Sequence, residues 1–260
     1  MYATAVLGAD AESATARLLE ELDGRVGIVR VEEASSDGGV SIARGSTEYV
    51  LDDGWRASGD GLSVGDALDR LAPDHEYAFV LGVTETDLPK IVVGDETDDA
   101  IVAATDAGDL ELTTVIESIH ETEPYETLES LVAAVKRSDD AEHAGAIATF
   151  TGRVRAKEND DDERTQYLEF EKYEGVAERR MDAIETELEA RDGVLDVRLH
   201  HRTGRLADGE DIVFVVVLAG HREEAFRTVR DGINRLKDEV PLFKKEVTDE
   251  ETFWVHETGS

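Results

Sequence analysis

DIVFVVVLAGHREEAFRTVRDGINRLKDEVPLFKKE, residues 211–246, begins with an almost continuous apolar run and continues as a polar segment with helical period. A continuous apolar run of this length is typical of a central strand that is covered on both faces. The spacing over 221–240 predicts a helix, which Pro241 ends because proline cannot continue a helix. We therefore expect a strand, a helix and a return of the chain past Leu242 and Phe243.

Three of the seven lysines of the chain lie in this stretch, at Lys237, Lys244 and Lys245. The chain holds 61 acidic and 27 basic residues, and 20 of the basic ones are arginine, so a lysine cluster stands out. Two ammonium groups held close together favour proton loss from one of them, which suits a base or a nucleophile. The alternative is a solvated helix end, where cations complement the helix dipole.

The chain is strongly acidic, with a net charge of −34 over 260 residues, yet 40% of its residues are apolar. At low ionic strength such a chain repels itself. Molar salt shortens the Debye length to about 3 Å and screens that repulsion. The composition therefore predicts a halophilic protein from a salt-filled cytoplasm, and it argues against nucleic-acid binding, which needs a basic surface.

Composition also excludes several kinds of site. The chain has no cysteine, so disulfides, zinc–cysteine sites, iron–sulfur clusters and thiol nucleophiles are excluded. No apolar run approaches the roughly 20 residues of a membrane span, and the first residues lack the features of a signal peptide. We expect a soluble, cytoplasmic protein that needs neither a metal nor a cofactor and has no membrane partner.

The charge is unevenly spread along the chain. Residues 1–140 carry a net charge of −23 and residues 141–260 a net charge of −11. The polar segment SDDAEH (138–143) separates the two parts. We therefore predict two domains, 1–137 and 144–260, joined by this linker.

The first half predicts an α/β domain with a mostly parallel sheet. Its short apolar segments indicate strands, and its amphipathic segments indicate helices. The strands are expected at 3–8, 25–31, 76–83 and 90–95, a hairpin at 40–51 turning at Arg44-Gly45-Ser46, and helices at 11–22 and 127–137.

The second half predicts an α+β domain. Its strands combine one continuous apolar run with segments that alternate between apolar and polar residues. The strands are expected at 144–155, 167–173, 194–204, 211–220 and 251–257, with helices at 176–191 and 221–240.

Two segments of the second half suit an anionic ligand. At Gly220-His221-Arg222 a strand passes into a helix, and the free N–H groups of a helix start bind anions. Arg153 and Arg155 are two residues apart on a predicted strand, so both project from one face. The alternatives are an ordinary junction capped by His221 and an edge strand protected by cations.

Two other features point away from function. His200 and His201 are adjacent on a predicted strand, so their rings face opposite sides and cannot bind one metal together. Gly8 follows the first strand as in a phosphate-binding loop, but Ser13-Ala14-Thr15 replaces the required Gly-Lys-Ser/Thr. We therefore expect no nucleotide hydrolysis at this loop.

Four motifs of the second half occur together and in order. They are GAIATFTGRVR (145–155), YLEFEKYEGVAE (167–178), LHHRTGRLADGEDIVFVVVLAGHREEAF (199–226) and LKDEVPLFKKE (236–246). Through these motifs, residues 144–257 resemble the large, catalytic subunit of molybdopterin synthase. The resemblance implies a hammerhead-like α+β fold and the conversion of cyclic pyranopterin monophosphate to molybdopterin. It implies a sulfur donor, the thiocarboxylated C-terminus of a small ubiquitin-like carrier that ends in Gly-Gly, and a homodimer within a heterotetramer.

By position, the resemblance also implies roles for individual residues. Lys237 and Lys244 match the two active-site lysines, and Lys237 is the better candidate for acid/base work or transient acylation by the carrier tail. Phe150 matches a pocket aromatic. The positions that match substrate- and anion-binding residues are Arg153, Arg155, His221, Arg222, Lys245 and Glu246.

Two parts of the first half form a second pattern: the first strand, loop and helix, and the segment YAFVLGVTETDLPKIVV (77–93). Through them the first half resembles a degenerate relative of the GTP-binding molybdopterin-guanine dinucleotide biosynthesis protein B. Ala14 replaces the phosphate-binding lysine, and Leu81 stands where an acidic residue precedes Gly82. The resemblance therefore implies a docking or structural module that binds no nucleotide.

Two other functions remain open at this point. The second half could be a non-catalytic binding module that captures ubiquitin-like proteins by their Gly-Gly tails. From pattern alone it could also be a small-molecule-sensing domain of ferredoxin-like order.

Overall fold

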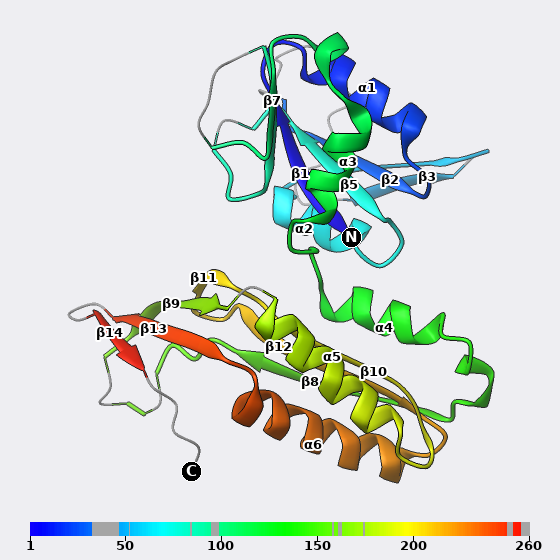
Figure 1. Ribbon diagram of the computed structural model, residues 1–260, viewed down its shortest axis with the longest axis vertical. Coiled ribbons are helices and arrows are strands. Elements are labelled where there is room, and N and C mark those ends of the chain that lie inside the picture. Colours follow the sequence, from blue (N-terminus) through cyan, green and yellow to red (C-terminus); the bar gives the residue numbers. More distant parts are fainter. Residues whose placement is uncertain are drawn as a thin grey trace. The chain divides into compact units, whose positions relative to one another are not determined.

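The computed structural model describes residues 1–32, 47–51, 53–83, 85–94, 99–157, 159–160, 163–173, 175–248 and 252–255. The chain forms two compact units, Met1–Glu126 and Thr127–Ser260 (Figure 1). Within the described residues, no helix has both the length and the apolar character required to cross a bilayer.

The first unit is built on a five-stranded sheet in which every neighbouring pair is parallel. Helices cover both of its faces, which explains why its central strands are apolar throughout. The prediction of an α/β unit with a parallel sheet is confirmed. In sheet order the strands are β2 (Val26–Arg30), β5 (Tyr77–Leu81), β1 (Tyr2–Leu7), β6 (Lys90–Val93) and β7 (Val102–Ala104).

Three helices complete the core of the first unit. α1 (Ala11–Glu21) and α3 (Leu112–His120) pack on one face of the sheet, where Leu18 and Ile119 are fully buried. α2 (Val64–Leu71) packs on the other face through Leu68.

The predicted hairpin at 40–51 can be followed only in its second strand, β3 (Thr47–Leu51), because its first strand lies outside the described residues. β3 pairs with β4 (Trp55–Gly59), a strand that follows it in the chain and was not predicted. The predicted turn at 44–46 lies outside the described residues. The polar residues around Gly54 were an equally good turn signal, because glycine and aspartate both favour turns.

The connection from β1 to α1 is very short. It consists of Gly8, Ala9 and Asp10. Gly8 has φ +98°, and a Cβ at this position would lie 2.0 Å from the carbonyl oxygen of Val93, so only glycine fits. The Asp10 carboxylate accepts a 2.9 Å hydrogen bond from the backbone of Ala107, in the 3₁₀ helix η1 (Ala107–Asp109). That bond, with the Ser13 side chain, lowers the pKa of Asp10.

The second unit contains a three-stranded antiparallel sheet in the order β10-β12-β8. β12 (Asp211–Ala219) lies at its centre and is buried on both faces, as the continuous apolar run predicted. β10 (Val194–His201) and β8 (Ala146–Arg153) flank it. α5 (Val176–Glu189) and α6 (Arg222–Glu239) cover one face, and α4 (Leu128–Lys136) covers the other (Figure 1).

α4 corrects the predicted boundary between the halves. We expected this helix to close the first half, but Leu131 and Val135 pack against Phe214 and Val216 of β12. Residues 138–143, predicted as a linker, therefore follow α4 within the second unit and include the 3₁₀ helix η2 (Ala141–His143). The apolar stripe of an amphipathic helix does not reveal which sheet it will cover.

A second antiparallel sheet completes this unit. Its strand order is β11-β9-β13-β14. The segment after Pro241 is thus a strand, which the sequence had indicated only as a return of the chain. The predicted strand at 194–204 is also divided, since β10 ends at His201 and a new strand begins at Gly204. The strands are β9 (Thr165–Lys172), β11 (Gly204–Ala207), β13 (Leu242–Thr248) and β14 (Thr252–Val255).

Candidate active site

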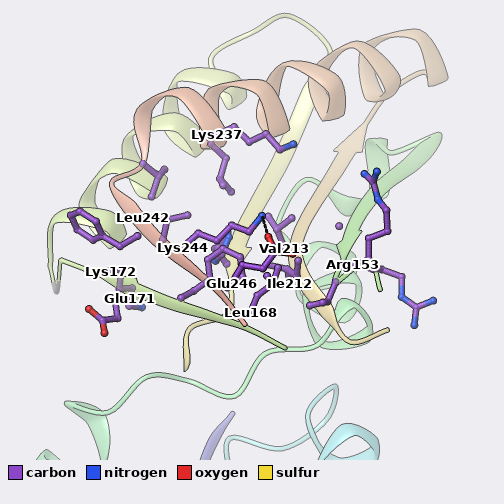
Figure 2. Close-up of a pocket in the computed structure, with 18 of the residues that line it drawn as sticks. Arg153, Leu168, Glu171, Lys172, Ile212, Val213, Lys237, Leu242, Lys244 and Glu246 are labelled. Atoms are coloured by element: carbon purple, nitrogen blue, oxygen red, sulfur yellow. Dashed lines mark ion pairs between the residues drawn. The ribbon is translucent and has the colours of Figure 1, made fainter. Parts of the chain in front are cut away.

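A cavity of about 1790 Å³ opens between the two sheets and the end of α6 in the second unit (Figure 2). Strands β8, β9, β12 and β13 contribute to its walls. Six of the nine residues expected to form the site line this cavity. They are Phe150, Arg153, Arg155, Lys237, Lys244 and Glu246.

The break at Pro241 brings the two lysines to one cavity. Lys237 lies in the last turn of α6, and Val240 leaves the helix with φ −88° and ψ 122°. This extended conformation is the one that a residue before proline prefers. The chain then enters β13, where Lys244 reaches the cavity from the strand (Figure 2).

Lys244 lies beside a carboxylate. Its Nζ is 3.7 Å from Oε2 of Glu246, two residues along β13 and therefore on the same face. The other carboxylate oxygen of Glu246 accepts a hydrogen bond from the Thr165 hydroxyl. Both side chains of the ion pair are about four-fifths buried, with 23% of Lys244 and 21% of Glu246 exposed.

A bulge in β12, opposite the end of β8, shapes the arginine side of the cavity. Arg153 pairs with Asp211 and Gly152 with Val213, so β12 has one extra residue at Ile212. The Arg153 Nε consequently lies 2.9 Å from Oδ1 of Asp211, and its guanidinium also donates to the carbonyl oxygen of Gly209.

Arg155 follows β8 and lines the cavity with Arg153. In Figure 2, Arg153 lies on the opposite side of the view from Leu242 and Lys172. In the same view, Lys237 and Lys244 lie between Arg153 and Lys172.

Three expected site residues lie elsewhere in the second unit. His221 and Arg222 stand at the start of α6, and the 16 residue steps from His221 to Lys237 span about 24 Å of helix. Lys245 faces the opposite side of β13 from Lys244, and its Nζ binds Oε2 of Glu169 at 2.8 Å. This hydrogen bond raises the pKa of Lys245. Strand alternation explains the difference, because neighbouring residues on a strand face opposite sides.

Lys172 lines the cavity although the sequence analysis did not single it out. Only 11% of its side chain is exposed, and its Nζ lies 2.7 Å from Oε1 of Glu178. The second oxygen of Glu178 accepts from the backbone N–H of Gly175 at 2.6 Å, at the start of α5. Burial acts to raise the pKa of Glu178, but the bond from Lys172 and the backbone bonds outweigh it, so the pKa is lowered.

Two exposed aromatic residues also line the cavity and were missed. Tyr173 is 61% exposed and Phe243 is 36% exposed. Their rings meet edge to face at 5.3 Å, with an interplanar angle of 76°. The alternation of apolar and polar residues in YLEFEKY (167–173) predicted a strand with one solvent-exposed face. It did not indicate that an aromatic residue of β13 would lie beside Tyr173.

The two adjacent histidines face opposite sides of β10, as predicted. His200 stacks on Phe214 at 6.2 Å, whereas His201 meets Phe170 edge to face at 4.8 Å. His201 is buried, and its Nδ1 lies 2.8 Å from the carbonyl oxygen of Arg202.

Comparison with known proteins matches both units of the chain. The family model described as MoaE protein matches residues 120–239, from the last residue of α3 to the end of α6. A Haloferax volcanii protein named "Probable molybdopterin synthase" is 49% identical over 263 residues, covering 99% of this chain and 100% of that protein.

Other relatives match about half of the chain. Molybdopterin synthase catalytic subunits of Pyrococcus abyssi and Cereibacter sphaeroides are 35% and 41% identical, covering 49% and 45% of this chain and 82% and 78% of their own length. The solved structure of molybdopterin synthase from Staphylococcus aureus is 30% identical, with a TM-score of 0.45, and covers 52% of this chain and 93% of that chain.

The match to the Haloferax volcanii protein extends beyond residue 239 and so includes the β13 segment that carries Lys244. Since 49% identity extends over the whole length of both proteins, the chain belongs to the MoaE family of molybdopterin synthase catalytic subunits, enzymes of molybdenum cofactor biosynthesis.

Proposed function

We propose that this chain transfers sulfur from the thiocarboxylated C-terminus of a small ubiquitin-like carrier to cyclic pyranopterin monophosphate. The observation that carries the proposal is the cavity itself, which brings together Arg153 and Arg155 from the end of β8 and the segment after it, Lys237 from α6 and Lys244 from β13. A phosphate-bearing substrate needs guanidinium groups to bind it, and sulfur transfer from an acyl donor needs groups that move protons.

In this proposal the two arginines bind the substrate and the two lysines Lys237 and Lys244 transfer protons. Arg153 and Arg155 hold the anionic part of the substrate, and Phe150 contacts the pterin ring. Each carbon–sulfur bond forms as a carbon–oxygen bond of the substrate breaks, and Lys237 and Lys244 accept and donate the protons, including the one that the departing oxygen takes. Water then hydrolyses the bond between the carrier's acyl carbon and the sulfur, so the sulfur stays on the substrate and the carrier leaves as a carboxylate.

The size of the cavity suits two reactants. Its volume of about 1790 Å³ exceeds the roughly 300–1,000 Å³ of a typical small-molecule site. A pterin and the Gly-Gly tail of a carrier together use this space better than either alone. The tail needs a path to the lysines, and the exposed pair Tyr173 and Phe243 provides an apolar wall for it.

We also propose that the chain forms a homodimer with one carrier on each protomer. His221 and Arg222 lie about 24 Å of helix away from Lys237 in their own protomer. In a dimer with twofold symmetry, the start of one α6 can approach the cavity of the partner, which gives these residues a route to substrate.

The function is tested with the purified chain, the substrate and a thiocarboxylated carrier. Sulfur transfer is expected to lower the intact mass of the carrier by about 16 Da as its thiocarboxylate becomes a carboxylate. Dithiolene product should appear at the same time. A stable complex in which the carrier keeps its mass would instead support the alternative of a binding module and refute the enzyme.

Replacing Tyr173 with alanine is expected to weaken carrier binding about tenfold, because exposed aromatic residues at an interface often supply 1–2 kcal/mol. Turnover at saturating carrier should change little. Calorimetric titration measures the affinity. The matched control is Tyr49→Ala on β3, since Tyr49 is also 61% exposed but lies in the first unit. Equal effects of the two changes would contradict the proposed tail path.

We propose that the first unit is the degenerate relative of the GTP-binding family and acts as a docking or structural module. The three-residue connection between β1 and α1 is too short to wrap a phosphate, and Asp10 places a carboxylate beside the helix start. We expect no binding of GTP at millimolar concentration in calorimetric titration. Saturable binding that Asp10→Asn strengthens would show instead that the loop is a working phosphate site.

A further inference from the structure

The ion pair between Lys244 and Glu246 is held by a third residue, Thr165, which no motif in the sequence indicated. Thr165 is the first residue of β9 and only 5% of it is exposed. Its hydroxyl donates to one oxygen of Glu246, while the other oxygen faces the Lys244 ammonium at 3.7 Å. All three residues line the cavity.

A bulge in β9 places Thr165 on the same face of the sheet as Glu246. Val247 pairs with Tyr167, but the next residue of β13, Thr248, pairs with Thr165, so β9 carries an extra residue at Gln166. In regular alternation Thr165 would share the face of Tyr167, which is opposite to that of Glu246. Because of the extra residue, the Thr165 side chain lies on the face of Glu246 instead. Bulges commonly redirect a side chain beside a site in this way.

The hydrogen bonds of Glu246 argue against direct contact with substrate. One of its oxygens is engaged with a hydroxyl and the other with an ammonium group. A carboxylate also repels a phosphate-bearing ligand, whereas it attracts and orients an ammonium group. Glu246 is therefore better suited to holding Lys244 than to the substrate-binding role that the resemblance implied.

We propose that Glu246 is a positioning residue for Lys244 and that Thr165 fixes Glu246 in place. The Thr165 hydroxyl leaves the carboxylate one orientation, and the carboxylate in turn directs the Lys244 ammonium. This inference rests on the proposed function only in giving Lys244 a part in the reaction. The geometry of the three side chains stands without it.

The test measures the reactivity of Lys244 directly. Trace acetylation of the full chain, followed by peptide mass spectrometry, gives the labelling rate of Lys244 relative to Lys237 in the same molecule. In Thr165→Val, the Glu246 carboxylate loses the hydrogen bond that fixes it, and the Lys244 ammonium loses a fixed partner. The labelling rate of Lys244 relative to Lys237 should therefore rise about three- to fivefold. Glu246→Gln should raise it at least as much, and Thr165→Ser, which keeps the hydroxyl, should restore it.

A neighbouring pair supplies the control. The Thr248 hydroxyl donates to the Glu163 carboxylate at 2.9 Å, which is the same kind of bond between the same two segments. Thr248→Val should leave the labelling ratio unchanged. Melting temperatures of all variants identify any general loss of structure, which would raise the labelling of both lysines together.

Turnover separates this inference from the proposed function. We expect Thr165→Val to lower kcat while KM for the substrate and carrier affinity stay unchanged. An unchanged labelling ratio in Thr165→Val overturns the role of Thr165, and an unchanged ratio in Glu246→Gln overturns the positioning of Lys244. A raised ratio with normal turnover in both variants would keep the positioning and refute the catalytic role of Lys244.

Discussion

Replacing Lys237 with alanine is expected to abolish product formation, with a loss of turnover of about 10²- to 10⁴-fold. Lys237 lies in the cavity at the end of α6, and alanine removes the only group at this position that can transfer a proton. The fold should persist, because an exposed lysine at a helix end contributes little to stability. Carrier binding, which depends on the intact fold, should therefore persist as well. Product is measured by release of the dithiolene, and binding by titration with the carrier.

The matched control for this change is Lys136→Ala. Lys136 is also an exposed lysine in the last turn of a helix, but α4 lies on the opposite face of the sheet from α6. It should keep full activity. If Lys237→Ala turns over at the wild-type rate with an intact fold, Lys237 has no catalytic role and the proposed mechanism fails.

Raising KCl from 0.1 M to 2 M is expected to raise the melting temperature by at least about 10 °C. The net charge of −34 opposes folding through self-repulsion, and molar salt screens it almost completely. The first unit should respond more strongly, because residues 1–126 carry a net charge of −22 and residues 127–260 a net charge of −12. Melting curves followed by circular dichroism at several KCl concentrations measure the effect.

Sucrose distinguishes screening from a general solvent effect. It strengthens the burial of apolar groups by exclusion from the protein surface, but it does not screen charge. At equal osmolality it should raise the melting temperature much less than KCl. A melt that is insensitive to salt, or equally sensitive to sucrose, would contradict the halophilic interpretation. That interpretation agrees with the 49% identity to the Haloferax volcanii protein.

The sequence alone determined which segments became helices and strands wherever the signal was local. The continuous apolar run became β12, the helical period became α6, and Pro241 ended that helix. These features follow from short-range rules of side-chain period and backbone geometry. The resemblance to the molybdopterin synthase catalytic subunit rested on the same segments and is confirmed.

Local rules gave weaker signals in other places. α2 (Val64–Leu71) and α3 (Leu112–His120) were not predicted, although the capping box of Ser63 and Asp66 marks the start of α2. β13 was not predicted as a strand, because the charged run KKE hides the alternation that pairs it with β9. Strand preference depends on the neighbouring strand more than on the residues themselves.

Only the tertiary structure decided which residues share the cavity. Lys244 and Lys245 are neighbours in sequence, but strand alternation directs one to the cavity and the other to Glu169. His221 matches the family pattern but lies at the far end of α6 from the cavity.

Two bulges completed the site, at Ile212 and at Gln166, and neither carries a sequence signal of its own. The face of a strand residue depends on register, and register is set by pairing between segments far apart in the chain. Local pattern therefore determined the elements, whereas long-range pairing decided which of their side chains meet.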